Sequence, residues 1–371
     1  MQEKKEKISV YFIVPASTGI SPSQRFRFEQ YLILLKEQGI RYRVSGFYTE
    51  NGWKTIFTRG NYVKKAFIVL RGVGKRFIDL FRLAPFRLIY IHREALPLGP
   101  PFFEWFMSRV LRKKIIYDFD DSIWIPAISK YNKRAIYFKN FGKVAKICRW
   151  SFKVSVGNRY LAEYASRFNR NVYIVPTVVD TEAVHNKMQV HQTQHPAIGW
   201  TGTFSTLPYL DIVMPVLKEL QETNDFDLVV IAETDPILPL KNYTFVKWKR
   251  ETEAEDLLRF HIGLMPLYDD AISQGKCGFK AIQYMSLGIP AIVSPVGVNS
   301  EIVDNQVNGF VSDSNTDWKE NLLFLLKNAE VRQKMGMSAR KKIEDSYSVK
   351  SSFPLFLGLL SKDQDPAKKY S

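Results

Sequence analysis

The chain has 371 residues, of which 46% are hydrophobic and 24% charged, so it is long enough for two globular domains and too apolar for a disordered protein. The formal net charge is +16, but no helix-turn-helix, zinc-finger or RNA-binding pattern accompanies it, and we therefore expect no nucleic-acid partner. The two cysteines, Cys148 and Cys277, lie far apart without metal-ligand spacing, which argues against a structural zinc and favours a reducing compartment.

The basic excess is confined to the first half of the chain. Residues 1–180 hold 33 Lys and Arg against 13 Asp and Glu, a balance of +20, whereas residues 181–371 hold 20 against 24, a balance of −4. A solvated basic surface and a face for an anionic membrane or a lipid phosphate both explain this excess. The charged start has no apolar signal core, and no run reaches the roughly 18 apolar residues of a spanning helix. We therefore expect a cytoplasmic protein, with any membrane contact peripheral on the inner face.

The first half begins as an α/β domain does, with a strand, a glycine loop and a helix. The β-branched run at 8–14 predicts a strand, and the loop after it ends at Gly19. The helix expected over 21–39 would carry Arg25 and Arg27 in its first turn, where a cation opposes the helix dipole. Gly19 and Arg25 are therefore candidate binding residues, although two solvated arginines fit the pattern equally well.

Two further helices of this half combine apolar spacing with basic residues. They are expected over 62–83 and 97–114. The first carries six basic residues, namely Lys64, Lys65, Arg71, Lys75, Arg76 and Arg82. A basic amphipathic helix can lie on a membrane surface, and it can equally be a core helix whose basic residues point outward.

Three carboxylates, Asp118, Asp120 and Asp121, follow the strand predicted at 115–117. Ligands collect at the carboxyl ends of strands in open α/β sheets, so a carboxylate there can orient a ligand hydroxyl or accept its proton. A helix N-cap explains one of the three but hardly all of them. They are candidate catalytic residues without an assigned role.

The second half opens with a polar segment, 181–195, that predicts a loop or linker. Its histidines, His185, His191 and His195, are expected to be solvated, and we expect no metal site. A strand at 197–200, a small-residue loop at 201–206 and a helix at 207–220 follow. Gly202 and Thr203 lie in that loop before a helix N-terminus, which is a place where phosphate binds.

The stretch 275–293 has the clearest pattern, a loop, a helix, a turn and a buried strand. Gly275-Lys276-Cys277-Gly278 opens it, and the following helix has apolar residues at helical spacing. Backbone N–H groups at Gly278 and Phe279, with Lys276 and Lys280 beside them, predict a site for a phosphate.

This stretch resembles the donor-binding segment of the retaining GT-B glycosyltransferases of family 4. The family's two glutamates, eight positions apart, fall on Gly275 and Gln283, whereas Lys276 and Lys280 match a subgroup with Gly-Lys-x-x-x-Lys. The resemblance covers most of the chain and is strongest over 196–311. It implies that Gln283 binds the ribose, that the strand end at Trp248 binds the nucleobase, and that no metal or other cofactor is required.

The resemblance also implies the fold and the activity. The fold is α/β of the GT-B type, with two Rossmann-like domains facing each other across a cleft. We expect an acceptor-side domain over 1–190, a nucleotide-sugar domain over 191–345, and over 346–371 a helix that packs back on the first domain, then a polar tail. The expected reaction is sugar transfer from a nucleotide-diphosphate sugar to a glycan or lipid-linked acceptor in cell-envelope polysaccharide or glycolipid synthesis.

Three other interpretations remain open. A GT-A transferase would hold a metal with Asp118 and Asp120, but a bare Asp-x-Asp pattern is weak and leaves 275–293 unexplained. A nucleotide-sugar 2-epimerase would keep the fold and change the chemistry. A non-catalytic scaffold or membrane-surface binding protein would keep the fold alone, and Gly275 and Gln283 are its best support.

Overall fold

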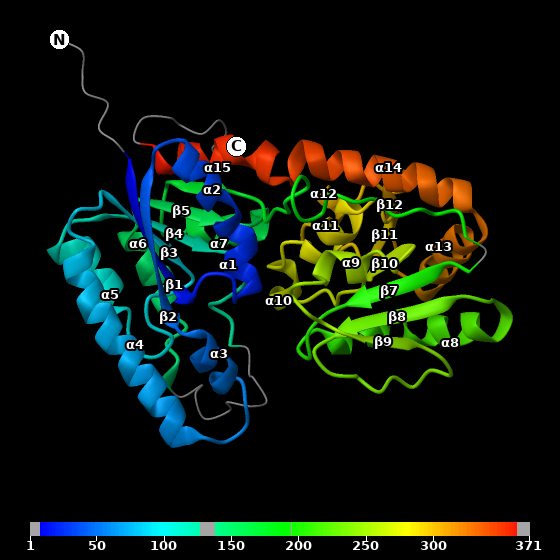
Figure 1. The fold of residues 1–371 in the computed structure, drawn as a ribbon, viewed down its shortest axis with the longest axis horizontal. Helices are drawn as coiled ribbons and strands as arrows, with labels where there is room; N and C mark the ends of the chain where they lie inside the picture. The colour runs from blue at the N-terminus through cyan, green and yellow to red at the C-terminus, as the bar shows by residue number, and fades with distance from the viewer. Residues whose placement is uncertain (1–7, 127–137, 194, 362–371) are drawn as a thin grey trace, which may run out of the picture. The chain divides into compact units, whose positions relative to one another are not determined.

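The structure is a computed structural model that describes residues 8–126, 138–193 and 195–361. The chain divides into two compact units, one formed by Met1–Thr177 with Phe353–Ser371 and the other by Val178–Ser352 (Figure 1). The first boundary precedes the one expected at residue 190 because the segment after 177 bonds to the second unit. The backbone N–H of Val179, for example, donates to the carbonyl of Tyr347 over 3.1 Å.

The first unit is built on a parallel sheet of six strands in the order β2-β1-β3-β4-β5-β6. The strands are β1 (Ser9–Ala16), β2 (Arg41–Tyr48), β3 (Leu88–His92), β4 (Lys114–Phe119), β5 (Lys153–Val156) and β6 (Val172–Ile174). The central strands are buried along nearly their whole length, as expected of a parallel sheet covered on both faces. The described helices are α1 (Pro22–Arg27), the 3₁₀ turn η1 (Glu29–Tyr31), α2 (Leu32–Glu37), α3 (Glu50–Ile56), α4 (Tyr62–Arg82), α5 (Phe102–Trp105), the π-helical η2 (Phe106–Val110), α6 (Lys143–Trp150) and α7 (Arg159–Ser166).

Two helices of this unit differ from the prediction. The one expected over 21–39 is broken into α1, η1 and α2, because Phe28 leaves the helical region at φ −144° and its ring stacks on Phe12 of β1. Arg25 and Arg27 consequently lie in the last turn of a short helix and not in the first turn of a long one. The helix expected over 97–114 covers only 102–110, as α5 and η2.

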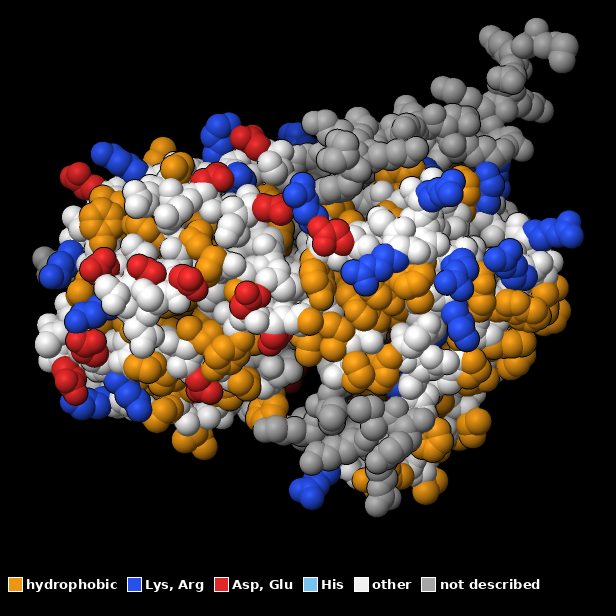
Figure 2. Space-filling view, turned by 180° about the vertical axis from the view of Figure 1, so that it is seen from behind, with side chains coloured by type: hydrophobic (Ala, Val, Ile, Leu, Met, Phe, Trp, Pro, Cys, Tyr) orange, Lys and Arg blue, Asp and Glu red, His pale blue; other side chains and the backbone are white. Residues whose placement is uncertain are grey.

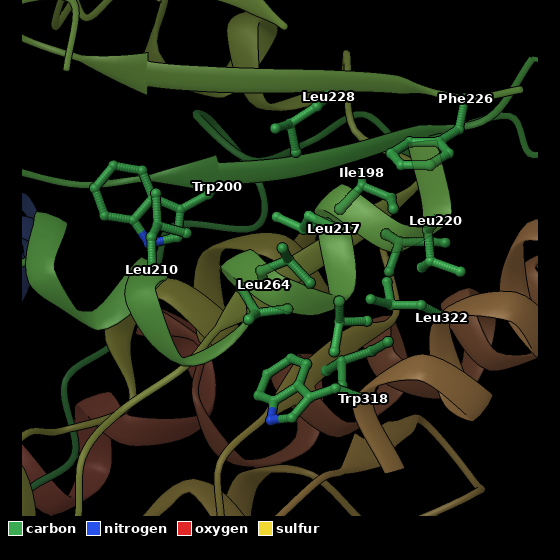
Figure 3. Packing of buried hydrophobic residues seen from close by; sticks show 14 of the residues in the cluster. Ile198, Trp200, Leu210, Leu217, Leu220, Phe226, Leu228, Leu264, Trp318 and Leu322 are labelled. Atoms are coloured by element: carbon green, nitrogen blue, oxygen red, sulfur yellow. The ribbon is translucent and has the colours of Figure 1, made fainter. Parts of the chain in front are cut away.

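The second unit repeats the architecture with the strand order β12-β11-β10-β7-β8-β9, again parallel throughout. The strands are β7 (Ala197–Thr201), β8 (Asp227–Ala232), β9 (Thr244–Lys247), β10 (Ile262–Met265), β11 (Ala291–Val293) and β12 (Gly309–Val311). The described helices are η4 (Leu207–Ile212), α8 (Met214–Thr223), α9 (Glu253–Leu257), α10 (Ala271–Gln274), α11 (Phe279–Ser286), α12 (Asn299–Ile302), α13 (Asn315–Lys327) and α14 (Ala329–Ser346). Figure 3 shows one layer of its core, where Leu217 of α8 packs beside Ile198 of β7 and Trp318 of α13 lies under the same cluster.

Helix α15 (Val349–Leu360) begins in the second unit, and its later residues belong to the first. Phe356 stacks on Tyr31 with ring centroids 4.4 Å apart. The buried ammonium of Lys153 donates to the carbonyls of Gly358 and Leu359 near the end of the helix, over 3.3 and 3.2 Å. The end of a helix, with its unpaired carbonyls, is a favourable place for a cation, so this contact fixes the helix end on the sheet.

The expectation of solvated histidines is wrong for His185 and His191, both of which are fully buried. His191 Nε2 donates to the carbonyl of Gly288 over 2.8 Å, and Arg340 donates to the carbonyl of His185. Polar groups of this segment form hydrogen bonds within the second unit. A polar sequence alone does not distinguish such a segment from a solvated linker. Within the described residues, no helix combines the length and the apolar character needed to cross a bilayer.

Candidate active site

The three predicted aspartates of the first unit lie at the end of β4, but they are not equally accessible. The side chain of Asp118 is fully buried, that of Asp120 is 12% exposed and that of Asp121 is 39% exposed. Because β3 and β4 are parallel neighbours, with His92 opposite Asp118, the end of β3 contributes to the same place. Only Asp120 and Asp121 have surface through which a ligand could contact them.

Asp118 is the centre of a buried polar network. Its oxygens accept hydrogen bonds from the Arg27 guanidinium at 2.5 and 3.3 Å, from the Ser155 hydroxyl at 2.7 Å and from His92 Nδ1 at 2.7 Å. Burial by itself raises the pKa of this carboxyl, but the Arg27 charge and the bond from His92 outweigh burial and hold it well below its usual range. Asp118 is therefore ionised and held in place by its partners.

Asp120 connects to the same network from the outer side. The Ser23 hydroxyl lies 2.6 Å from Asp120 Oδ2 and 2.8 Å from His92 Nε2. Arg93, which has a left-handed backbone at φ 61°, donates to Asp120 Oδ1 over 3.0 Å and reaches Asp121 at 3.4 Å. Burial raises the pKa of the Asp120 carboxyl, but the charges of Arg93, His92 and Arg27 lower it to about 2, so Asp120 is also ionised near neutral pH.

Sequence reasoning missed Ser23, Arg27 and His92 as members of this group. His92 is the last residue of a buried strand, and that position was the available signal, because polar residues ending adjacent parallel strands meet at one edge. The predicted residues Gly19 and Arg25 also belong to this unit. The Gly19 N–H donates to Glu29 Oε2 over 2.7 Å, and the Arg25 guanidinium lies 4.6 Å from the centroid of the Phe26 ring.

In the second unit, the predicted loop and helix are present at 275–286. Gly278 precedes α11 with a left-handed backbone at φ 64°, and a Cβ there would lie 2.1 Å from Ile302 Cδ1, so the position requires glycine. Close approach of α11 to the sheet also requires Gly263, whose added Cβ would lie 2.3 Å from the Tyr284 ring. The Tyr284 hydroxyl in turn accepts the N–H of Thr201 at the end of β7.

Both predicted lysines of this segment lie over aromatic rings. Lys280 Nζ is 4.8 Å from the centroid of the Trp200 ring, and Lys276 Nζ is 5.6 Å from that of Tyr209. Burial, and to a smaller extent the charge of Lys276, lowers the pKa of Lys280 to about 7. Among the described residues, no hydrogen bond or salt bridge reaches the Lys280 amine, so only the ring compensates its charge.

Two buried donors near these lysines lack partners within the described chain. Gln283 is 3% exposed, and its Nε2 makes no hydrogen bond; the same holds for Trp200 Nε1. Gln283 lies one turn after Lys280 on α11. Buried donors without partners are uncommon and call for an explanation. An anionic, oxygen-rich ligand supplies what an ammonium and an amide donor lack.

The other predicted residues of this unit also lie where its parallel strands end. Gly202 and the exposed Thr203 follow β7, and the Thr203 N–H donates to the Thr206 hydroxyl over 3.0 Å. Phe279 is the first residue of α11. Trp248 follows the edge strand β9, donating its N–H to the Ala232 carbonyl and its Nε1–H to Glu253 over 2.8 and 3.3 Å.

Residues 240–342 match the family model described as Glycosyl transferases group 1. No curated protein sequence matches the chain. Among solved structures, sucrose-phosphate synthase from Thermosynechococcus elongatus has a TM-score of 0.67 at 13% identity, and the alignment covers 95% of this chain and 98% of that one. A glycosyltransferase from Rickettsia africae has a TM-score of 0.64 at 11% identity, covering 96% and 98%. Anabaena Alr3699/HepE in complex with UDP and glucose has a TM-score of 0.61 at 13% identity, covering 95% and 99%.

These findings support a glycosyltransferase. The predicted GT-B fold is confirmed, since both units are Rossmann-like and the likeness spans nearly the whole chain. The matched segment contains β9 to β12 and α11, which carry Trp248, both lysines and Gln283. The second unit therefore carries the Lys280 amine and the Gln283 amide nitrogen, neither with a hydrogen-bond partner in the described chain, and the first unit carries a network of carboxylates with a partly exposed edge.

Proposed function

We propose that the protein transfers a sugar from a nucleotide-diphosphate sugar, and that the second unit binds the donor. Lys276 and Lys280 hold the diphosphate with the N–H groups at Gly278 and Phe279, the Gln283 amide bonds the ribose, and the strand end at Trp248 meets the base. The observation that carries this proposal is the half-buried Lys280 amine in the first turn of α11, which has no hydrogen-bonding partner in the described chain and lies near the charge of Lys276.

The comparisons and the charge distribution supply the rest of the proposal. Alr3699/HepE has been crystallised with UDP-glucose, and S. aureus TarM, whose alignment spans 55% of its length, with UDP and α-GlcNAc-glycerol. By analogy, we propose that this chain uses a nucleotide sugar and a glycan or lipid-linked acceptor in cell-envelope polysaccharide or glycolipid synthesis, with retention at the anomeric carbon. Lysines and helix N–H groups can stabilise the leaving diphosphate, so the proposal requires no metal or other cofactor.

A thermal-shift panel of UDP-, GDP- and other nucleotide sugars tests donor binding, because a ligand of the native state raises the melting temperature by mass action. We expect one nucleotide class to stabilise the wild type and to stabilise Lys276→Ala much less. Lys218→Ala, which removes an exposed lysine of α8, is the matched control and keeps the full shift. If no nucleotide shifts the wild type, the proposal is wrong.

Transfer itself is measured with a radiolabelled nucleotide sugar and a lipid extract as acceptor. Label in the lipid fraction supports a transferase. A free sugar isomer would identify a nucleotide-sugar 2-epimerase instead. Bound donor without either product would favour the non-catalytic scaffold that Gly275 and Gln283 leave open.

We also propose that the first unit binds the cytoplasmic face of a membrane through α4, whose polarity is the reverse of that of an ordinary surface helix. Its buried residues are Lys65, Gly72, Arg76 and Asp79, and none of them is a large apolar residue. Outward-facing residues include Val63 (86% exposed), Phe67 (67%), Leu70 (69%) and Phe81 (82%). On the face drawn in Figure 2, the surface of this unit shows blue side chains among orange ones and few red ones.

The polar inner face of α4 is explained by a network that replaces apolar packing. Arg76 donates to the Val14 carbonyl over 2.8 Å, to the Ala95 carbonyl over 2.8 Å and to Asp79 Oδ2 over 2.8 Å. Asp79, the one acidic residue of α4, also accepts the Tyr11 hydroxyl over 2.7 Å. Of the basic residues of this helix, Lys65 and Arg76 are therefore buried. Lys64, Arg71 and Arg82 are exposed and could contact an anionic lipid surface.

Vesicle co-sedimentation tests this attachment. We expect binding to vesicles with anionic lipid that weakens as salt screens the charges. The double variant Phe67→Ser/Phe81→Ser should remain in the supernatant, and Met337→Ser, an equally simple loss of an exposed apolar side chain from α14, should bind as wild type does. Wild-type protein that stays in the supernatant at low salt contradicts the proposal.

A further inference from the structure

A line of hydrogen bonds runs from Asp118 through His92 and Ser23 to Asp120. If His92 is neutral, the ring and the Ser23 hydroxyl do not have enough protons to make every contact in this line a hydrogen bond. Asp118 is buried and ionised, so His92 Nδ1 must donate to it across 2.7 Å. A neutral imidazole then has an unprotonated Nε2, which could only accept. The Ser23 hydroxyl has one proton and two acceptors within reach, Nε2 at 2.8 Å and Asp120 Oδ2 at 2.6 Å.

Neither arrangement of a neutral His92 satisfies both contacts. If Ser23 donates to Asp120, its oxygen faces the lone pair of Nε2 across 2.8 Å; if Ser23 donates to Nε2, its oxygen faces an ionised carboxylate across 2.6 Å. A doubly protonated ring removes the conflict, because Nε2–H donates to Ser23 and the Ser23 proton goes to Asp120. Every donor in the line then has an acceptor.

The hydrogen bonds, and not the net charge, indicate this protonation of His92, because Asp118 and Asp120 are already matched by Arg27 and Arg93 and the Asp121 side chain is 39% exposed. Among the described residues, the charged groups that interact with His92 are Asp118 and Asp120; it also contacts the Ser23 hydroxyl, and the centroid of the Phe28 ring lies 6.1 Å from its own.

We propose that His92 carries both ring protons in the working enzyme, and that the Asp118–His92–Ser23 line is a positioning device that fixes Asp120 as the carboxylate that receives an acceptor hydroxyl. Asp120 is the member of the line with exposed surface, and Ser23 and Arg93 hold its two oxygens in one orientation. The part that concerns Asp120 rests on the proposed glycosyltransferase function. The protonation of His92 does not depend on it.

The protonation is tested by nitrogen NMR of the full chain labelled with ¹⁵N-histidine, with His92→Gln to assign the signals. We expect protons on both ring nitrogens of His92 at pH 7. Ser155→Ala, which removes a different hydroxyl from Asp118, should leave both protons in place, whereas Ser23→Ala, which removes the acceptor of Nε2–H, should leave a proton on Nδ1 alone. A single protonated nitrogen in the wild type at pH 7 overturns the proposal, whether or not the protein transfers sugar.

The positioning role is tested by sugar-transfer kinetics over a range of pH. Loss of Ser23 frees Asp120 to rotate, so Ser23→Ala should lower kcat on the order of 100-fold and leave KM for the nucleotide sugar unchanged. It should also move the alkaline limb of the pH profile to lower pH, and Ser23→Thr should restore both. If Ser23→Ala has the wild-type kcat and pH profile, Asp120 is not positioned in this way.

Discussion

The clusters at the carboxyl edges of the two sheets differ in whether their hydrogen bonds are complete. In the first unit, Asp118 has hydrogen-bond partners on both oxygens. In the second unit, the Lys280 amine and the amide nitrogen of Gln283 have no hydrogen-bond partner in the described chain. A closed network stabilises its own unit, whereas unsatisfied donors weaken theirs until a ligand binds. The comparison teaches that the same fold can use charge for structure at one edge and for binding at the other.

The largest expected effect comes from breaking the hydrogen-bond network around Asp118. Asp118→Asn leaves Arg27 and His92 without their carboxylate, and removing one partner of a buried charge network costs about 3–5 kcal/mol. Urea unfolding should show this loss as a lower midpoint. Asp121→Asn, at a site with a 39% exposed side chain, is the control and should change stability by no more than about 0.5 kcal/mol. Equal effects in the two variants would mean that the Asp118 network does not stabilise the unit.

A change at Lys280 should have the opposite effect on stability. Lys280→Met removes a half-buried cation that has no ion-pair partner in the described chain, so the free protein should be as stable as the wild type or more stable. A charge-assisted hydrogen bond contributes about 1.5–3 kcal/mol, so the affinity for the nucleoside diphosphate should fall at least tenfold. Calorimetric titration measures the affinity, and urea unfolding measures the stability. Loss of stability together with unchanged affinity would mean that Lys280 stabilises the fold and does not bind the nucleotide.

The pH dependence of binding sharpens the same contrast. The pKa of Lys280 in the free protein is lowered to about 7, so the amine loses its charge above pH 7. Because the folded-state pKa lies below the ordinary one, Lys280 destabilises the folded protein at any pH below its ordinary pKa. This destabilisation is greatest below about pH 7. An anion at the amine raises that pKa, so binding takes up a proton. Affinity for the nucleoside diphosphate should fall by up to about tenfold per pH unit above pH 7. Calorimetry in buffers of different ionisation enthalpy measures the uptake, and Lys280→Met should abolish it.

The smallest expected effect is at Gln283. Gln283→Leu keeps the volume and removes an amide whose nitrogen has no partner, so stability should be unchanged or slightly higher. If the amide bonds the ribose, the affinity for the nucleotide should fall by about 0.5–1.5 kcal/mol, the contribution of an ordinary hydrogen bond. The nucleobase alone should bind both proteins equally. An unchanged nucleotide affinity would place Gln283 away from the ribose.

Sequence patterns predicted the alternation of strands and helices because buried parallel strands and amphipathic helices have local signatures. The loop and helix that begin at Gly275 were found in this way, and so was the strand that leads into Asp118, although β4 extends through Asp118 to Phe119. The pattern could not show that Arg27 would meet Asp118, since the pair is 91 positions apart and forms only when the sheet does. Nor could it show which face of α4 turns inward, because the inner face is held by Arg76 and Asp79 and not by apolar residues.

Helix α15 has a consequence for how the chain is made. The second unit is a continuous stretch from 178 to 352, so all of it can fold once that stretch has left the ribosome. The first unit emerges earlier, yet Tyr31 lacks its stacking partner Phe356, and Lys153 lacks the carbonyls of Gly358 and Leu359, until residues 353–360 have been synthesised. We therefore expect the earlier-translated unit to be the later one to finish folding, and to need protection from aggregation in the interval.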